Sequence, residues 1–199
     1  MITSETVQLE NARVLLRPLV AKDASALLGF VKEESEIWTY SLRQLQTTSD
    51  LNDYISEALR LKKLGSTYAF TVFDKLKKQY AGCTRFYNID DVHKTLMLGY
   101  TWYGKEFQGT GLNKNVKLLL LEYAFEILQM ERVEFRADVN NLRSIRAMKS
   151  IGCKEEGVLR QNFAIANKRR DSIILSIIKT EWAECKQLLL KSIYNGTNN

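Results

Sequence analysis

The sequence of 199 residues has one histidine, one proline and three cysteines, and these shortages exclude several kinds of site. The single histidine, His93, lies in a polar stretch typical of a turn, so a histidine-based metal site or a Ser-His-Asp triad has little support. Cys83, Cys153 and Cys185 are far apart and lack metal-ligand spacing, which favours reduced thiols over a disulfide framework. We therefore expect no metal site.

Long apolar runs are also missing, since none is long enough to cross a bilayer. The first residues, Met-Ile-Thr-Ser-Glu, have neither the basic segment nor the apolar core of an export signal. We therefore expect a cytoplasmic protein that does not bind membranes. Hydrophobic residues make up 45% and charged residues 26% of the chain, which is typical of a globular protein. The length predicts a single domain over residues 1–199.

The formal net charge of +6 raises the question of nucleic-acid binding. The basic residues are scattered, with groups at expected turns near 75–78 and 168–170 and on a short helix near 143–149. Solvated turns explain most of this charge, and no RNA- or DNA-binding signature accompanies it. A nucleic-acid partner is not expected, although a basic rim would steer a polyanionic ligand toward the protein.

Hydrophobic periodicity predicts alternating strands and helices. Strands are expected at 7–18, 68–74, 79–88, 95–103, 132–139, 155–166 and 171–178, and helices at 24–33, 50–63, 113–129, 141–151 and 181–193. Polar connections between 74 and 95 favour antiparallel hairpins. The strands near 100 and 135 flank a buried helix, so they should be parallel neighbours joined by a right-handed crossover.

Between that strand and that helix, the chain reads Gln108-Gly-Thr-Gly111-Leu-Asn113. Glycines permit backbone conformations closed to other residues, and a helix N-terminus offers free N–H groups and a positive dipole end. The junction is therefore typical of a phosphate cradle and would accept a pyrophosphate. Taken alone, it is explained equally well as a tight strand-to-helix turn.

Four residues at spacings of three, four and three share one face of the helix at 141–151: Asn141, Ser144, Met148 and Ile151. Helix physics alone explains the two polar residues as an N-cap, in which Asn140 or Asn141 satisfies free N–H groups. The functional alternative places both side chains in the gap beside the parallel strands, near the ligand of the glycine loop. The two interpretations are compatible.

These motifs resemble those of the GCN5-related N-acetyltransferase (GNAT) superfamily. Gln108–Asn113 is similar to its acyl-CoA pyrophosphate loop, Gln/Arg-x-x-Gly-x-Gly/Ala, with Asn113 departing at the last position. Asn141-Leu-Arg-Ser144 followed by Ile151–Gly157 resembles the Asn-x-x-Ser…Gly-Phe…Glu-Gly element of the RimJ/RimL-like branch, which acetylates the N-termini of ribosomal proteins. The resemblance implies an α/β (α+β) fold with a mixed, mostly antiparallel central sheet, a splayed parallel strand pair and flanking helices.

The resemblance also implies that acetyl-CoA lies in the splay. Backbone amides of the loop would hold its pyrophosphate, from Gln108, Gly109, Thr110, Gly111, Leu112 and Asn113. The main chain of β-strand residues would pair with the pantetheine arm as an added strand does, at Tyr100, Thr101 and Trp102. Asn141 would bond the same arm, and Ser144 would lie near the thioester sulfur and protonate the leaving thiolate.

The implied reaction is direct attack of a free amine on the thioester carbonyl, which requires a general base or a water chain leading to one. The two positions where family members carry a glutamate read Met97 and Phe163 here. Glu106, Asp138 and Tyr103 are the remaining candidates for proton transfer, and a water relay through backbone carbonyls is equally open.

We therefore expect an acetyl-CoA-dependent N-acetyltransferase that acts on a primary amine, either a protein N-terminus or a small molecule. Trp38–Tyr40 and the hairpin at Phe163–Arg170 should line the acceptor side. One alternative is a non-catalytic acyl-CoA-binding module that has lost its base. Another is an RNA- or ribosome-associated protein, which only the net charge favours. Dimers are common in the superfamily, so a homodimer is open.

Overall fold

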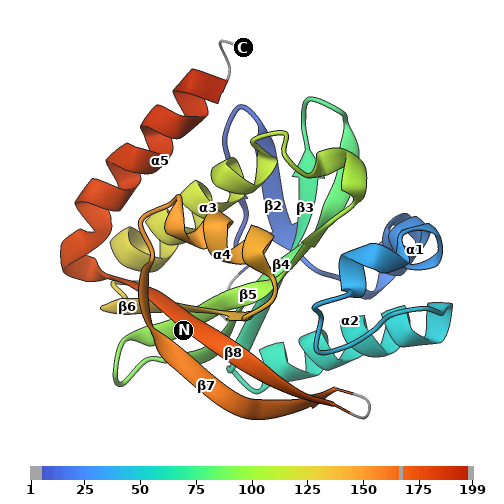
Figure 1. Cartoon of the computed structure of the whole chain (residues 1–199). Helices are drawn as coiled ribbons and strands as arrows, with labels where there is room; N and C mark the ends of the chain where they lie inside the picture. The colour runs from blue at the N-terminus through green and yellow to red at the C-terminus, as the bar shows by residue number, and fades with distance from the viewer. Residues whose placement is uncertain (1–5, 166–167, 197–199) are drawn as a thin grey trace.

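Eight strands form one mixed sheet in the computed structural model, which describes residues 6–165 and 168–196 (Figure 1). The strands lie in the order β1-β2-β3-β4-β5-β6-β8-β7. Their bounds are β1 Leu9–Glu10, β2 Val14–Pro18, β3 Thr67–Asp74, β4 Gln79–Asp90, β5 Thr95–Tyr103, β6 Arg132–Asp138, β7 Lys154–Ile165 and β8 Lys168–Ile178. The helices are α1 Ala24–Glu33, α2 Thr48–Lys63, α3 Leu112–Glu122, α4 Leu142–Lys149 and α5 Trp182–Gly196.

Every strand pair is antiparallel except β5–β6. The parallel pairing covers only three residue pairs, from Thr95–Arg132 to Met97–Glu134. Beyond them β5 continues beside β4 as far as Tyr103, while β6 continues beside β8 as far as Asp138. The two strands therefore separate, which confirms the predicted fold with its splayed parallel pair.

Two apolar clusters cover opposite faces of the sheet because side chains alternate along each strand. On β3, Tyr68 and Phe70 belong to the cluster that contains α3 and α5, whereas Ala69 belongs to the cluster that contains α1 and α2. In Figure 1, α3, α4 and α5 accordingly lie to one side of the strands and α1 and α2 to the other.

The structure corrects two expectations about local structure. The predicted strand at 7–18 is a hairpin, because the side-chain oxygen of Asn11 accepts hydrogen bonds from the N–H groups of Arg13 and Val14 and turns the chain. The predicted turn at 168–170 is the beginning of β8, where Arg170 is buried. The strand predicted at 155–166 and the hairpin at 163–170 include residues 166–167, which lie outside the described residues.

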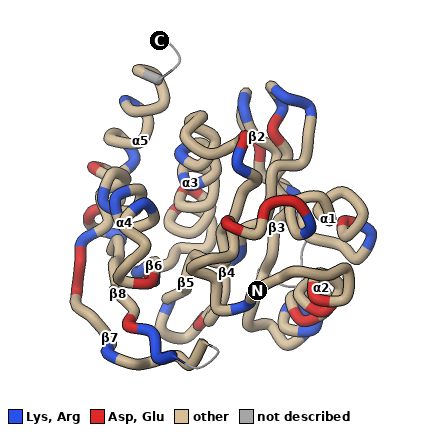
Figure 2. The backbone as a smooth tube through the Cα atoms, turned by 45° about the vertical axis from the view of Figure 1, so that its right-hand side comes forward, with Lys and Arg blue, Asp and Glu red and all other residues tan. Residues whose placement is uncertain are grey.

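Basic side chains are spread over the fold. Figure 2 shows Lys and Arg on α3, α4 and α5 and on turns at either end of the sheet, interspersed with Asp and Glu. Many of them form ion pairs, such as Lys149 with Glu155 at 2.7 Å and Arg13 with Asp74 at 2.8 Å. Much of the positive charge is therefore balanced locally.

Candidate functional site

The glycine loop takes a conformation that requires glycine. Gly109 and Gly111 have φ angles of 76° and 81°, in the left-handed region that other residues rarely adopt. Gly111 is also the N-cap of α3. A Cβ atom added at either glycine would meet no atom within 4 Å, so the loop faces open space. Because the first N–H groups of a helix have no intrahelical acceptor, this loop can receive an anion.

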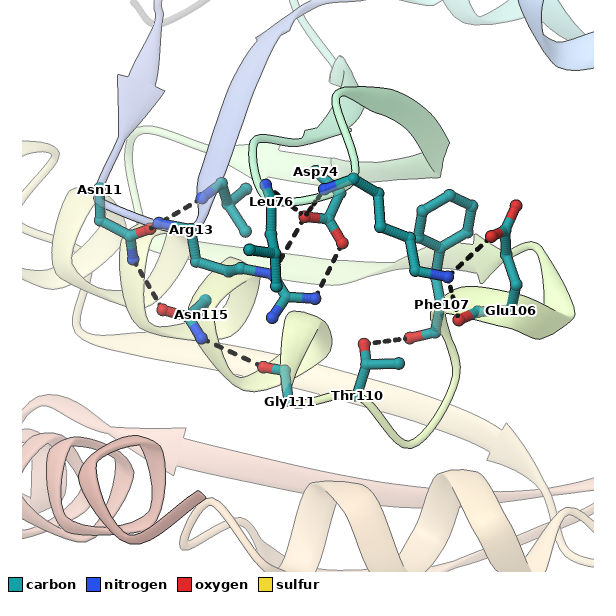
Figure 3. A network of polar contacts seen from close by, with 11 residues as sticks. Asn11, Arg13, Asp74, Leu76, Glu106, Phe107, Thr110, Gly111 and Asn115 are labelled. Atoms are coloured by element: carbon teal, nitrogen blue, oxygen red, sulfur yellow. Dashed lines mark hydrogen bonds and ion pairs between the residues drawn. The ribbon is translucent and has the colours of Figure 1, made fainter. Parts of the chain in front are cut away.

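Hydrogen bonds from neighbouring segments hold the loop in place (Figure 3). The side-chain amide nitrogen of Asn115 donates to the carbonyl oxygen of Gly111 at 3.2 Å, and the side-chain amide nitrogen of Asn11 donates to the side-chain oxygen of Asn115 at 3.0 Å. The Thr110 hydroxyl donates to the carbonyl oxygen of Phe107 at 2.8 Å. The loop is therefore anchored to the β1–β2 turn and to the start of α3.

The other end of the loop is attached to β5 and α4. The side-chain amide of Gln108 donates to the carbonyl oxygen of Tyr103 at 2.9 Å, and its oxygen accepts from the Arg143 guanidinium. The Tyr103 hydroxyl donates to the side-chain oxygen of Asn113 at 3.1 Å. The sequence analysis counted Arg143 only as surface charge, yet the residue borders the loop. Its position in the first turn of α4, between Asn141 and Ser144, could have indicated this role.

A cavity of 1710 Å³ runs from the loop through the splay between β5 and β6. That volume exceeds the roughly 300–1,000 Å³ of a typical small-molecule pocket, so the cavity is large enough to hold two ligands in contact with each other. Nearly all of the predicted site residues line it: Tyr100, Thr101, Trp102, Tyr103, Gln108, Gly109, Thr110, Gly111, Asn113, Asn141 and Ser144. The side chain of Leu112 instead packs in the core, which leaves its backbone N–H as the group that could serve a ligand.

A β-bulge bends β5 at the mouth of the splay. The register between β4 and β5 shifts between Cys83 and Arg85, and Tyr100 has a φ angle of 49°. Thr84 and Thr101 then meet through their hydroxyl oxygens at 2.8 Å. Bulges re-aim side chains beside binding sites, and a strained non-glycine residue in this position is consistent with a functional role.

Asn141 and Ser144 form the predicted helix cap and also line the cavity. The side-chain oxygen of Asn141 accepts a hydrogen bond from the Ser144 N–H at 3.1 Å, which makes Asn141 the N-cap of α4. Both residues are half-buried and line the cavity. The Ser144 hydroxyl is not needed for the cap, since the cap uses its backbone N–H.

The candidates for proton transfer differ in their surroundings. Burial raises the pKa of Tyr103 above its ordinary value, so its hydroxyl is protonated at neutral pH. Glu106 forms an ion pair with Lys77 at 2.7 Å and does not line the cavity. Asp138 does line it; one of its oxygens accepts from the Asn140 N–H at 2.8 Å, and the other lies 3.6 Å from Arg170 Nε.

The part of the cavity where the acceptor was expected is largely aromatic. The predicted lining residues Trp38, Tyr40 and Phe163 are all there, and Trp38 packs against Trp102 with ring centroids 4.9 Å apart. Arg170 ends the hairpin that was expected on the acceptor side, and it also lines the cavity. Expected on a solvated turn, it is instead buried and donates to the carbonyl oxygen of Tyr40 at 3.1 Å. It thereby links β8 to the segment between α1 and α2.

Sequence reasoning also passed over Lys117. It lies on α3, is 6% exposed and lines the cavity. Its Nζ donates to Thr101 Oγ1 at 3.1 Å and lies 5.6 Å from the centroid of the Phe135 ring. Burial lowers its pKa to about 8. A single lysine within the apolar run Val116–Leu121 was the signal that could have singled it out.

Residues 13–154 match the sequence model of the acetyltransferase (GNAT) domain. The chain belongs to the GNAT family. Members use acetyl-CoA as acetyl donor, and the match identifies the chain as an N-acetyltransferase. The family membership inferred from the glycine loop and from the Asn-x-x-Ser element is confirmed.

Relatives of this GNAT chain include proteins with different acceptors. It is 31% identical over 132 residues to YdaF of Bacillus subtilis, named as a candidate ribosomal N-acetyltransferase, covering 58% of this chain and 72% of that one. It is 25% identical to the ribosomal protein uS5-alanine N-acetyltransferase of Escherichia coli, covering 60% and 62%. It is 29% identical to spermidine N(1)-acetyltransferase of Escherichia coli, covering 56% and 61%. The first two names support the ribosomal-protein branch.

Solved structures agree with the fold. A candidate acetyltransferase from T. thermophilus is 31% identical, with a TM-score of 0.82 over 93% of this chain and 96% of that one. A GCN5-related N-acetyltransferase from Brucella melitensis, 23% identical, has a TM-score of 0.87 over 95% and 86%. Within residues 6–165 and 168–196, no helix of this GNAT chain could span a bilayer, and no group of three or more His, Cys, Asp or Glu could hold a metal ion.

Proposed function

We propose that the chain, as a single domain over residues 1–199, transfers an acetyl group from acetyl-CoA to a primary amine by direct attack on the thioester. One observation carries the proposal: the splay of β5 from β6 opens into a cavity that joins the glycine loop to the aromatic acceptor end. A donor bound along the loop and an acceptor entering from the other end would meet in the splay.

The donor side of the cavity fits acetyl-CoA. N–H groups of Gly109 to Asn113 at the α3 N-terminus would hold the pyrophosphate. β5 no longer pairs with β6 beyond Met97, so a ligand with amide groups would hydrogen-bond to backbone groups on this edge of β5, near Tyr100 to Trp102. Asn141 would bond the same arm with its free amide nitrogen. The nucleotide supplies affinity, while the thioester supplies the activated acyl carbon.

The chain's own groups would then manage two protons. As the amine nitrogen forms a bond to the acyl carbon and the carbon–sulfur bond breaks, Ser144 gives its hydroxyl proton to the departing thiolate and recovers a proton from the same nitrogen, which loses it on becoming the amide. Tyr103, protonated because it is buried, is the second candidate donor. The proton of the acceptor ammonium leaves through water toward Asp138, the candidate carboxylate that lines the cavity at the acceptor end.

Two arginines at that end suit a protein N-terminus as the acceptor. Arg136 and Arg170 line the cavity there, each beside a carboxylate: Arg136 with Glu134 at 2.7 Å and Arg170 with Asp138 at 3.6 Å. A peptide N-terminus brings carbonyl oxygens that accept hydrogen bonds from arginine N–H groups. We also propose a cytoplasmic location, which three buried, unpaired cysteines suit.

Ligand-induced stabilisation followed by turnover tests the function. Acetyl-CoA at a hundred times its dissociation constant should stabilise the protein by about 2.7 kcal/mol, whereas ATP should have a much smaller effect. Release of free CoA thiol with a panel of peptides and small amines then separates an enzyme from a non-catalytic acyl-CoA-binding module. Saturating acetyl-CoA without stabilisation would contradict the donor site, and binding without turnover on any amine would support the alternative.

A further inference from the structure

Lys117 is a buried cation whose charge no carboxylate balances within the described residues. Its neighbours come from three other parts of the fold: Thr101 on β5, Phe135 on β6 and Cys153 just before β7. Only Cys153 among these three is titratable, and burial raises the pKa of its thiol to about 12. The thiol is therefore neutral over the pH range in which the protein would work.

Packing alone does not account for a lysine here. An unpaired buried ammonium costs several kcal/mol, and an apolar side chain of similar length would fill the same space without that cost. The ammonium has three N–H donors, of which Thr101 accepts one. The residue also lines the cavity, so the remaining donors can reach a ligand there.

The position within the cavity indicates which ligand group these donors would meet. Thr101 lies on β5 directly after the bulge at Tyr100, beyond the last residue that pairs with β6. The ligand part expected at this level is the acyl-pantetheine arm, which carries amide and thioester carbonyls and no negative charge. A carbonyl oxygen accepts a hydrogen bond from an ammonium more strongly than from a neutral donor.

We propose that Lys117 is a donor-binding residue, whose Nζ, positioned by Thr101, donates a hydrogen bond to a carbonyl oxygen of the acyl-pantetheine arm. The inference rests on the proposed binding of acetyl-CoA and extends it to a side chain that neither the glycine loop nor the Asn-x-x-Ser element contains. It gives the arm a charged anchor in addition to the backbone of β5.

Calorimetric binding to wild type and Lys117→Met, with two ligands, tests the inference. Acetyl-CoA has the arm, whereas adenosine 3′,5′-bisphosphate shares the nucleotide end without it. We expect the variant to bind acetyl-CoA at least about tenfold more weakly and the bisphosphate with unchanged affinity. Lys191→Met, which removes an exposed charge on α5, should leave both affinities unchanged.

The outcomes separate this inference from the proposed function. Unchanged acetyl-CoA affinity in Lys117→Met, or equal weakening of both ligands, would overturn the role of Lys117 alone. Wild type that binds neither ligand would overturn the donor site itself. A second measurement needs no variant: because a carbonyl partner favours the ammonium, acetyl-CoA binding near pH 8.5 should take up a fraction of a proton, detectable by calorimetry in buffers of different ionisation enthalpy. Zero uptake there would also contradict the inference.

Discussion

Asn11 and Asn115 lie 104 residues apart in the sequence, and the side-chain amide of Asn11 donates a hydrogen bond to the side-chain oxygen of Asn115. Asn115 in turn donates to the carbonyl oxygen of Gly111, the N-cap of α3 (Figure 3). The conformation of the glycine loop is therefore connected to a turn near the N-terminus of the chain.

Asn115→Ala removes both of these hydrogen bonds. We expect the free energy of unfolding to fall by about 1–2 kcal/mol and acetyl-CoA binding to weaken, because the loop loses an anchor. Urea unfolding and ligand titration measure the two effects. Asn52→Ala, at an exposed position on α2, is the matched control and should change neither. Unaltered affinity in Asn115→Ala would show that the loop does not depend on this anchor.

Two substitutions at Gly111 separate backbone strain from charge. Gly111→Ala places a Cβ in open space, but at a φ angle of 81° that alanine rarely adopts. The free energy of unfolding should therefore fall by about 1 kcal/mol, and acetyl-CoA should bind moderately more weakly. Gly111→Glu has the same strain and adds an anion where the pyrophosphate would lie, so acetyl-CoA binding should be abolished. If the two variants bound acetyl-CoA equally, the loop would not be the pyrophosphate site.

Ser144→Ala tests the proposed proton donor. Since the helix cap uses the Ser144 backbone N–H, the substitution should leave α4 intact and change acetyl-CoA affinity by no more than a few-fold. Loss of general acid catalysis should lower kcat by about 10²–10⁴. Steady-state kinetics with peptide acceptors gives the comparison. A kcat equal to that of wild type would leave Ser144 without a catalytic role.

The buried amine of Lys117 should make stability depend on pH. Its folded pKa, about 8, lies below its ordinary value, so between about pH 8 and 10.5 the unfolded chain binds more protons and stability rises with pH. Lys117→Met lacks this rise. The variant should be more stable than wild type at pH 7, by up to roughly 3 kcal/mol, and this advantage should shrink toward pH 10. A constant difference in urea unfolding at the two pH values would contradict the burial of a charged amine.

Glu156 should contribute to stability at the other end of the pH scale. Hydrogen bonds from Arg132 at 2.6 Å and from the Ser176 hydroxyl at 2.6 Å lower its pKa to about 2. Because the folded pKa is depressed, the contribution is present above about pH 4.5 and is lost as pH falls toward 2. In Glu156→Gln, the free energy of unfolding should fall less between about pH 4.5 and 2 than it does in wild type. The difference should be below about 1 kcal/mol because the carboxylate is partly exposed. Acid unfolding of both proteins measures it.

Most of the strands and helices could be predicted from the sequence, because the periodicity of apolar residues and the positions of polar turns determine them. The glycine loop and the cap at Asn141 were also readable, since each depends on a few adjacent residues. Lys117 was missed, and the burial of Arg170 was not foreseen, for one reason: burial makes both charged residues significant, and burial depends on strands and helices distant in the sequence. A turn prediction at 168–170 likewise failed because pairing with β7 extends the strand.

Only three residue pairs join β5 to β6, so the sheet consists of an N-terminal and a C-terminal half with little backbone pairing between them. Acetyl-CoA lying between the two halves would hydrogen-bond along β5 on one side and to α4 on the other. It would thereby provide hydrogen bonds where the two strands do not pair with each other. Amide hydrogen exchange should then slow on both edges of the splay when acetyl-CoA binds. The donor substrate would then connect the two halves of the sheet, and the release of CoA after each turnover would remove that connection.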